Sequence, residues 1–110
     1  AEDLPALLRA AGEIDPVLQT ALESDQIHVI PTGCTTPLID LSKLSEECTA
    51  AAADIDLLML HGMGRAIESN ARARFTCDTL RTAMIKDQGV ATHVGAQLFD
   101  CIFRYTPDDA

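Results

Sequence analysis

The sequence predicts an α/β fold, in which helices lie on both sides of a mostly parallel sheet as a three-layer α/β/α arrangement. Residues 56–60 (Asp-Leu-Leu-Met-Leu) are apolar without alternation, which is typical of a strand buried on both faces in a parallel sheet. Further apolar runs at residues 80–86 and 97–105 are each preceded by a segment with helix signals. Strands that alternate with helices in this way predict an open sheet joined by right-handed crossovers.

The first part of the chain predicts two helices and a strand. Residues 3–11 carry leucines at helical spacing, with Asp3 as the N-cap, and residues 16–23 begin with a proline in the tolerated first turn after Asp15. Residues 26–31 are rich in β-branched side chains and predict a strand that runs into the turn at residues 32–37.

The remainder alternates between helix and strand. A helix is expected at residues 43–53, where Ser42 is the candidate cap before good helix formers. The elements expected after it are a strand at 56–60, a helix at 63–73, a strand at 80–86, a helix at 87–95 and a strand at 97–105.

The order of these elements predicts an incomplete domain. A helix in such folds connects two strands, yet the two leading helices have no strand before them. We therefore expect residues 1–110 to be the C-terminal portion of a larger domain, and residues 106–110 to form an acidic tail.

Composition limits the classes of function. Among 110 residues, 47% are hydrophobic, so the chain can build a core, and the formal net charge is −9. That charge repels phosphate backbones and anionic lipid, which argues against nucleic-acid and membrane partners. No apolar run is long enough for a membrane helix and the first residues lack a signal-peptide pattern, so we expect a soluble, cytoplasmic protein.

The four cysteines, Cys34, Cys48, Cys77 and Cys101, form no CxxC pair and have no zinc-ligand spacing. They are interpreted as buried reduced thiols, and a disulfide or redox role is the alternative.

The segment His-Gly-Met-Gly-Arg at residues 61–65 is the candidate phosphate site. In open α/β sheets, anions bind where a strand ends and a helix begins, because free backbone N–H groups and the helix dipole favour negative charge. Gly62, Met63 and Gly64 would line a close backbone approach to phosphate, and Arg65 would supply a planar fork of donors. Asn70 could orient a hydroxyl or amide of a substrate.

The motif alone is not specific. It lacks the Gly-Lys-Ser/Thr of a Walker loop, and Ile67 stands where the dinucleotide fingerprint needs a third small residue. A tight strand-to-helix turn with a solvated arginine is therefore an open alternative. Lys86 is interpreted either as a second phosphate contact or as a lysine that extends from a strand end.

Other polar residues have simpler interpretations. Asp40 and Asp78 are expected to be caps or turn acceptors rather than pocket residues. Arg72, Arg74 and Arg81 are expected to lie on a solvated face.

Beyond spacing, residues 56–70, 75–80 and 85–86 resemble the C-terminal part of the damage-control phosphatases, in the branch associated with pantothenate kinase. That branch carries a Glu-Gly-Met-Gly-Arg signature, which residues 62–65 match. Residues 32–41 resemble its Ser-Gly loop ending in Pro and Asp-Leu, and residues 95–105 resemble its last strand. The resemblance thus covers most of residues 26–105.

The resemblance implies a metal-dependent phosphatase that uses a divalent ion (Co, Ni, Mn or Mg) to hydrolyse phosphomonoesters of small metabolites, such as phosphopantetheine-like or sugar phosphates. His61 departs from the signature glutamate. The family's Asp-Asn metal motif has no counterpart here, so the resemblance implies that this chain alone does not bind the metal.

Three hypotheses follow. The chain is part of such a phosphatase, inactive by itself, whose partners are the missing N-terminal part of the domain or a pantothenate kinase domain. Alternatively, it is a non-catalytic phosphate-binding or regulatory module, or a truncated fragment without independent function. No catalytic or metal-ligating residue is assigned within the 110 residues.

Overall fold

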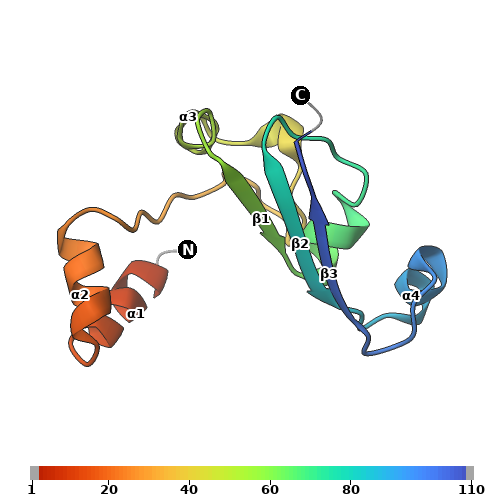
Figure 1. Ribbon diagram of the computed structural model, residues 1–110, viewed down its shortest axis with the longest axis horizontal. Coiled ribbons are helices and arrows are strands. Elements are labelled where there is room, and N and C mark those ends of the chain that lie inside the picture. Colours follow the sequence, from red (N-terminus) through yellow and green to blue (C-terminus); the bar gives the residue numbers. More distant parts are fainter. Residues whose placement is uncertain (1–2, 109–110) are drawn as a thin grey trace. The chain divides into compact units, whose positions relative to one another are not determined.

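The computed structural model describes residues 3–108, and the chain divides into two compact units, Ala1–Pro31 and Thr32–Ala110. Figure 1 shows the order of the elements along the chain. Among the described residues, no helix combines the length and the apolar character that crossing a membrane requires.

The first unit is a pair of short helices, α1 (Asp3–Gly12) and α2 (Pro16–Glu23), as the sequence predicted. Asp15 caps α2, because its side chain accepts hydrogen bonds from the backbone N–H groups of Val17 at 2.9 Å and Leu18 at 3.2 Å. Such a cap satisfies donors that have no partner inside the helix. The start of α2 is therefore fixed locally.

The strand predicted at residues 26–31 does not form, and this segment has no regular secondary structure. A strand needs a neighbouring strand for its backbone hydrogen bonds. The sheet within the described part of the chain has three strands, all later in the sequence. The prediction was wrong because β-branched composition says nothing about whether a pairing partner exists.

The second unit is built on a three-stranded mixed sheet, so the α/β class is confirmed. The strands β1 (Leu57–His61), β2 (Asp78–Met84) and β3 (Cys101–Thr106) lie in the order β1-β2-β3. β1 pairs with β2 in parallel, and β2 pairs with β3 in antiparallel orientation. β3 continues to Thr106, which is one residue into the segment expected as a tail.

The helical segments of this unit are shorter than predicted. They are η1 (Leu41–Lys43), α3 (Glu46–Ala51), η2 (Met63–Glu68) and α4 (Gln88–Val94). The helix expected at 43–53 begins later, because Ser45 rather than Ser42 supplies the cap, accepting from the backbone N–H of Cys48 at 3.0 Å.

The helix expected at 63–73 is a wide π-type turn that ends at Glu68. The backbone N–H of Ser69 donates to the carbonyl of Gly64 at 3.0 Å, and the Ser69 hydroxyl donates to the same oxygen at 2.7 Å. The Asn70 side chain donates to the carbonyl of Arg65 at 2.8 Å. Side chains that donate to backbone carbonyls in this way compete with the backbone N–H groups that would continue the helix.

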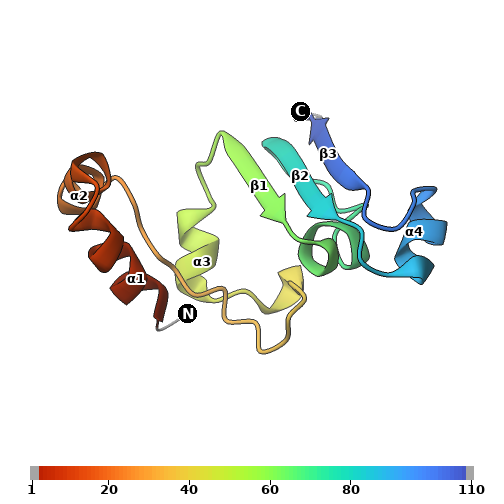
Figure 2. The ribbon, with the colours of Figure 1, turned by 90° about the horizontal axis from the view of Figure 1, so that it is seen from below.

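Only one face of the sheet is well covered. A small core joins Leu60, Ala66, Ile67 and Ala83, so η2 packs against β1 and β2. Figure 2 shows η2 and α4 on the same side of the strands. On this side of the sheet, the helical segments shield β1 and β2 from water.

The other face of the sheet is open. Met59 is 56% exposed and Phe103 is 76% exposed. β1 was predicted to be buried on both faces, but its residues alternate between exposed and partly or fully buried. In this unit, the predicted sheet is present as one parallel and one antiparallel pair of strands, and helical segments lie over one of its faces.

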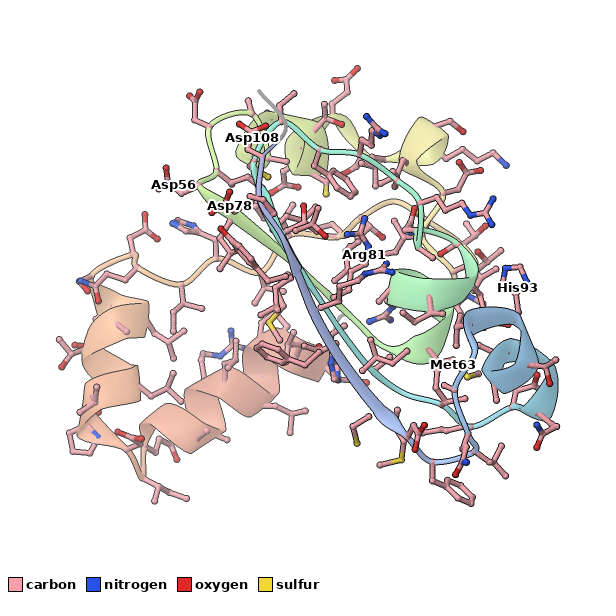
Figure 3. All side chains as sticks on the ribbon, turned by 45° about the vertical axis from the view of Figure 1, so that its right-hand side comes forward. Asp56, Met63, Asp78, Arg81, His93 and Asp108 are labelled. Carbon is pink, nitrogen blue, oxygen red and sulfur yellow. The ribbon has the colours of Figure 1, made fainter. Side chains whose placement is uncertain are left out.

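Arg81 is buried, with 2% of its surface exposed, which corrects the expectation of a solvated face. Its Nε–H donates to the carbonyl of Asn70 at 3.1 Å, and its Nη2 donates to the carbonyl of Ala73 at 2.6 Å. Its guanidinium carbon lies 5.8 Å from the centre of the Phe75 ring. Figure 3 shows Arg81 directed from β2 toward the helical segment η2. Arg81 therefore ties the segment after η2 to the sheet.

At the opposite end of β2, the side chain of Asp78 links the start of this strand to the C-terminal end of β3 and the residues after it. Its carboxylate accepts a hydrogen bond from the Tyr105 hydroxyl at 2.5 Å and one from the backbone N–H of Asp108 at 2.9 Å. Asp78 and Asp108 are both labelled in Figure 3, where they lie close together. The hydroxyl of Tyr105, followed by the Asp108 N–H, lowers the pKa of Asp78, and the bond to Asp78 raises the pKa of Tyr105.

Replacing Arg81 by methionine is expected to lower the free energy of unfolding by about 2 to 3 kcal/mol, because two carbonyls lose charged donors inside the fold. Urea unfolding followed by circular dichroism would measure the loss. The matched control is Arg72→Met, since Arg72 is exposed. Equal stability of the Arg81 and Arg72 variants would contradict the anchoring role.

Tyr105→Phe is expected to destabilise the fold most between about pH 5 and pH 9, where Asp78 is ionised and Tyr105 is protonated. Because the folded pKa of Asp78 is lowered, its contribution exists above the unfolded value near pH 3.9 and is lost as the pH falls. Because the folded pKa of Tyr105 is raised, its contribution exists below about pH 10 and is lost as the pH rises. Thermal unfolding of the two proteins across this range checks the prediction, which a pH-independent difference would refute.

Candidate functional site

The turn between β1 and η2 depends on Gly62. This residue has φ 110° and ψ 147°, a conformation that only glycine adopts without strain. Its N–H donates to the carbonyl of Thr82 at 2.9 Å, and its carbonyl accepts from the N–H of Ala66 at 2.8 Å. The turn is thus fixed to β2 on one side and opens η2 on the other.

A cleft of about 410 Å³ lies at this turn. The residues that line it come from the end of β1, from η2 and from the loop before η1: Pro37, Leu38, His61, Gly62, Gly64, Arg65 and Glu68. A Cβ atom on Gly64 would lie 2.9 Å from Leu38 Cδ2. Gly64 is therefore the residue that allows the loop to approach the turn.

Arg65 gives the cleft its positive charge. Its side chain is exposed, and its guanidinium has no hydrogen-bond or ion-pair partner within residues 3–108. Glu68 is the other charged side chain of the lining. A guanidinium with free donors beside glycine backbone suits the oxygens of a phosphate group.

The structure brings Gly62, Gly64 and Arg65 together in this cleft, whereas the lining does not include Met63 or Lys86. The sulfur of Met63 accepts a hydrogen bond from the backbone N–H of Lys86 at 3.2 Å, and Figure 3 shows Met63 beside α4. The Lys86 side chain is exposed and follows the end of β2. Phosphate contact by these residues stays a prediction.

Asn70 is 3% exposed and holds the backbone in place. Its Nδ2 donates to the carbonyls of Ile39 at 3.1 Å and Arg65 at 2.8 Å. It borders a second cleft, of about 690 Å³, whose lining also includes Lys43 and Arg72. Asn70 thus holds the loop before η1 against η2. Its predicted contact with substrate stays a prediction.

Leu38 and Glu68 are lining residues that the site prediction did not name. Leu38 borders both clefts, so the loop at residues 32–41 forms a wall between them. The signal that pointed to this loop was its resemblance to the family's Ser-Gly loop. Asp40, interpreted as a cap, accepts from the backbone N–H of Ser42 at 3.0 Å, and the hydroxyl and N–H of Ser42 lower its pKa.

The cleft does not offer a divalent metal a ligand set. Within residues 3–108, no three side chains of His, Cys, Asp or Glu gather in a group that could hold a metal ion. The cleft has one carboxylate, Glu68, and the cation of Arg65 would repel a second cation. Arg65 can donate to an oxyanion and balance its charge, whereas the Gly62 N–H is already bonded to the carbonyl of Thr82.

Comparison with known proteins gives the family. No protein-family model matches the chain. The chain is 38% identical to Pantothenate kinase 2 of Arabidopsis thaliana over 92% of its length and 46% identical to Pantothenate kinase 2 of Oryza sativa subsp. japonica over 74%. It is 38% identical to Damage-control phosphatase At2g17340 of Arabidopsis thaliana over 76% of its length.

A more distant similarity, 26% identity over 84% of the chain, is to 4'-phosphopantetheine phosphatase of Mus musculus. The chain spans only 12%, 9%, 23% and 17% of these four proteins, in the order given. One of the relatives that is 38% identical to the chain over most of its length is named a damage-control phosphatase. The chain therefore belongs to the damage-control phosphatase family.

Proposed function

We propose that the chain carries the phosphate-binding part of a metal-dependent phosphatase that hydrolyses phosphomonoesters of small metabolites. The observation that supports it is the cleft whose lining brings together the glycine turn and Arg65, whose exposed guanidinium is bound to no other group within residues 3–108. Phosphopantetheine-like and sugar phosphates are the proposed substrates, and the name of the mouse relative supports the first class.

The divalent ion, whether Co, Ni, Mn or Mg, is proposed to bind residues other than those described here. Unassisted hydrolysis of phosphate monoesters is extremely slow, and divalent ions accelerate it by stabilising negative charge. Since no three ligating side chains gather within residues 3–108, this chain would bind and orient the phosphoryl group, and Arg65 would stabilise the charge that develops on it.

The open face of the sheet supports the proposal that residues 1–110 are the C-terminal portion of a larger domain. Leu57, Met59, Phe103 and Tyr105 are all at least half exposed on that face. A contiguous apolar surface of this kind is typical of an interface. The proposed partner is the remainder of the same domain or a pantothenate kinase domain, which the names of two relatives suggest.

The second candidate function is a non-catalytic phosphate-binding module. It is favoured by the same cleft, which has the means to hold an anion and no metal ligand set within residues 3–108. Genomic sequence separates the candidates. An in-frame Asp-Asn metal motif directly upstream would favour the phosphatase, and its absence would favour the module.

Arg65→Ala is expected to weaken binding of inorganic phosphate by on the order of tenfold to a hundredfold, because charge-assisted hydrogen bonds are lost. Isothermal titration calorimetry on the 110-residue chain measures this. Arg72→Ala removes an exposed arginine outside the cleft and is the matched control. If both variants bound phosphate as the parent chain does, the cleft would not be the phosphate site.

Hydrolysis of p-nitrophenyl phosphate by the 110-residue chain is expected to stay at the level of buffer with Co²⁺, Ni²⁺, Mn²⁺ or Mg²⁺. The reason is that the described residues offer no metal ligand set. The assay follows nitrophenolate absorbance, with the Arg65→Ala variant alongside. Metal-dependent turnover that the variant loses would show that the chain does hold the metal and would overturn its proposed location.

A further inference from the structure

We propose that Arg104 is a positioning residue of the phosphate site, which acts together with Arg81 from two neighbouring strands. The two guanidiniums hold the turn at residues 70–73, and this turn carries Asn70, the side chain that joins η2 to the loop before η1. The inference rests on the proposed phosphate site and deepens it. It makes phosphate affinity depend on a side chain of β3, a strand that is outside the cleft lining.

The strands place Arg104 and Arg81 side by side, where both reach the same turn. They are register partners in the antiparallel pair of β2 and β3, and such partners project from the same face of a sheet. Nη2 of Arg104 donates to the carbonyl of Ala71 at 2.8 Å. Arg81 donates to the carbonyls of Asn70 and Ala73. Three carbonyls within four consecutive residues are therefore bound to two guanidiniums.

The turn acts on the cleft through the side chain of Asn70, which is buried. Its Nδ2 donates to the carbonyl of Arg65 in η2 and to that of Ile39 in the loop. Both bonds need the Asn70 backbone to stay in one place. Arg81 holds the peptide group that follows Asn70, and Arg104 holds the next one, so two planar units in succession are fixed to the sheet. Without Arg104, the second unit is free to rotate and Asn70 loses part of its support.

The two guanidiniums are poorly arranged for stability. Like charges directly opposite each other destabilise a sheet, and burial, followed by the charge of Arg104, lowers the pKa of Arg81. Within residues 3–108, neither arginine forms an ion pair with a carboxylate. Arg104 is also exposed, so its hydrogen bond adds little to the free energy of folding. We therefore expect its contribution in ligand binding, which depends on the geometry of the cleft, rather than in unfolding.

The test measures binding of inorganic phosphate to the 110-residue chain by isothermal titration calorimetry. The variants are Arg104→Met, which removes the donors, and Arg104→Lys, which keeps a charged donor. Arg9→Met is the matched control, because Arg9 is an exposed arginine of α1 in the other unit. Titrations at about 0.1 M and about 1 M sodium chloride separate a bond from a long-range charge effect, since the Debye length falls from about 10 Å to about 3 Å. Urea unfolding gives the midpoint for each variant.

Arg104→Met is expected to bind phosphate on the order of fivefold more weakly than the parent chain at both salt concentrations, the effect of one hydrogen bond. Its urea midpoint is expected to match that of the parent, because relief of repulsion with Arg81 offsets the lost bond. Arg104→Lys is expected to stay within about twofold of the parent affinity, and Arg9→Met is expected to equal it. In an Asn70→Ala background, Arg104→Met is expected to cause no further loss, since its effect passes through Asn70.

The outcomes that overturn the inference are distinct. Parent-like affinity in Arg104→Met, or a loss that vanishes at high salt, removes the positioning role while the phosphate site stands. A loss of affinity that accompanies a lower urea midpoint, without recovery in Arg104→Lys, shows a purely structural role. Equal losses with and without Asn70→Ala refute the route through Asn70. If that background does not fold, the salt comparison and Arg104→Lys still decide. If the parent chain binds no phosphate, the phosphate site is refuted and the role of Arg104 with it.

Discussion

The buried guanidinium of Arg81 is the interaction on which the candidate site depends. It reaches from the middle of β2 to the carbonyls of Asn70 and Ala73, which follow η2. Burying an arginine is unfavourable unless its donors are satisfied, so the two bonds and the Phe75 ring offset the loss of water. Burial, with a smaller contribution from Arg104, lowers the pKa of Arg81 from its ordinary value. Arginines nevertheless stay charged in proteins.

A chain of hydrogen bonds leads from Arg81 to the cleft. The Asn70 backbone is held by Arg81, and the Asn70 side chain holds the carbonyl of Ile39 from the loop and that of Arg65 from η2. The loop thereby lies against the glycine turn, where Leu38 meets Gly64. Through Asn70, one charged side chain in the sheet is thus linked to two of the segments that line the cleft, the loop and η2.

The charge of the cleft differs from the net charge of the chain. A net charge of −9 repels phosphate, and a family that acts on phosphate esters must overcome that field locally. Here the positive charge among the lining residues is the guanidinium of Arg65, which lies beside the glycine turn. In the proposed function, this guanidinium is the group that would overcome the repulsion.

The sequence by itself determined the elements that depend on neighbouring residues. The sequence alone predicted helices α1 and α2, the strand before the glycine turn and the family's Gly62-Met63-Gly64-Arg65 signature, because caps, periodicity and glycine chemistry act over a few positions. The α/β class followed from their order.

Only the tertiary structure decided the features that need distant partners. Residues 26–31 form no strand for want of a strand to pair with, and β1 has an exposed face because no described element of its unit covers it. Arg81 looked like a surface residue until the fold placed two unpaired carbonyls within reach of its donors. Local sequence specifies what a backbone segment prefers, whereas burial and pairing depend on residues that are far apart in the chain.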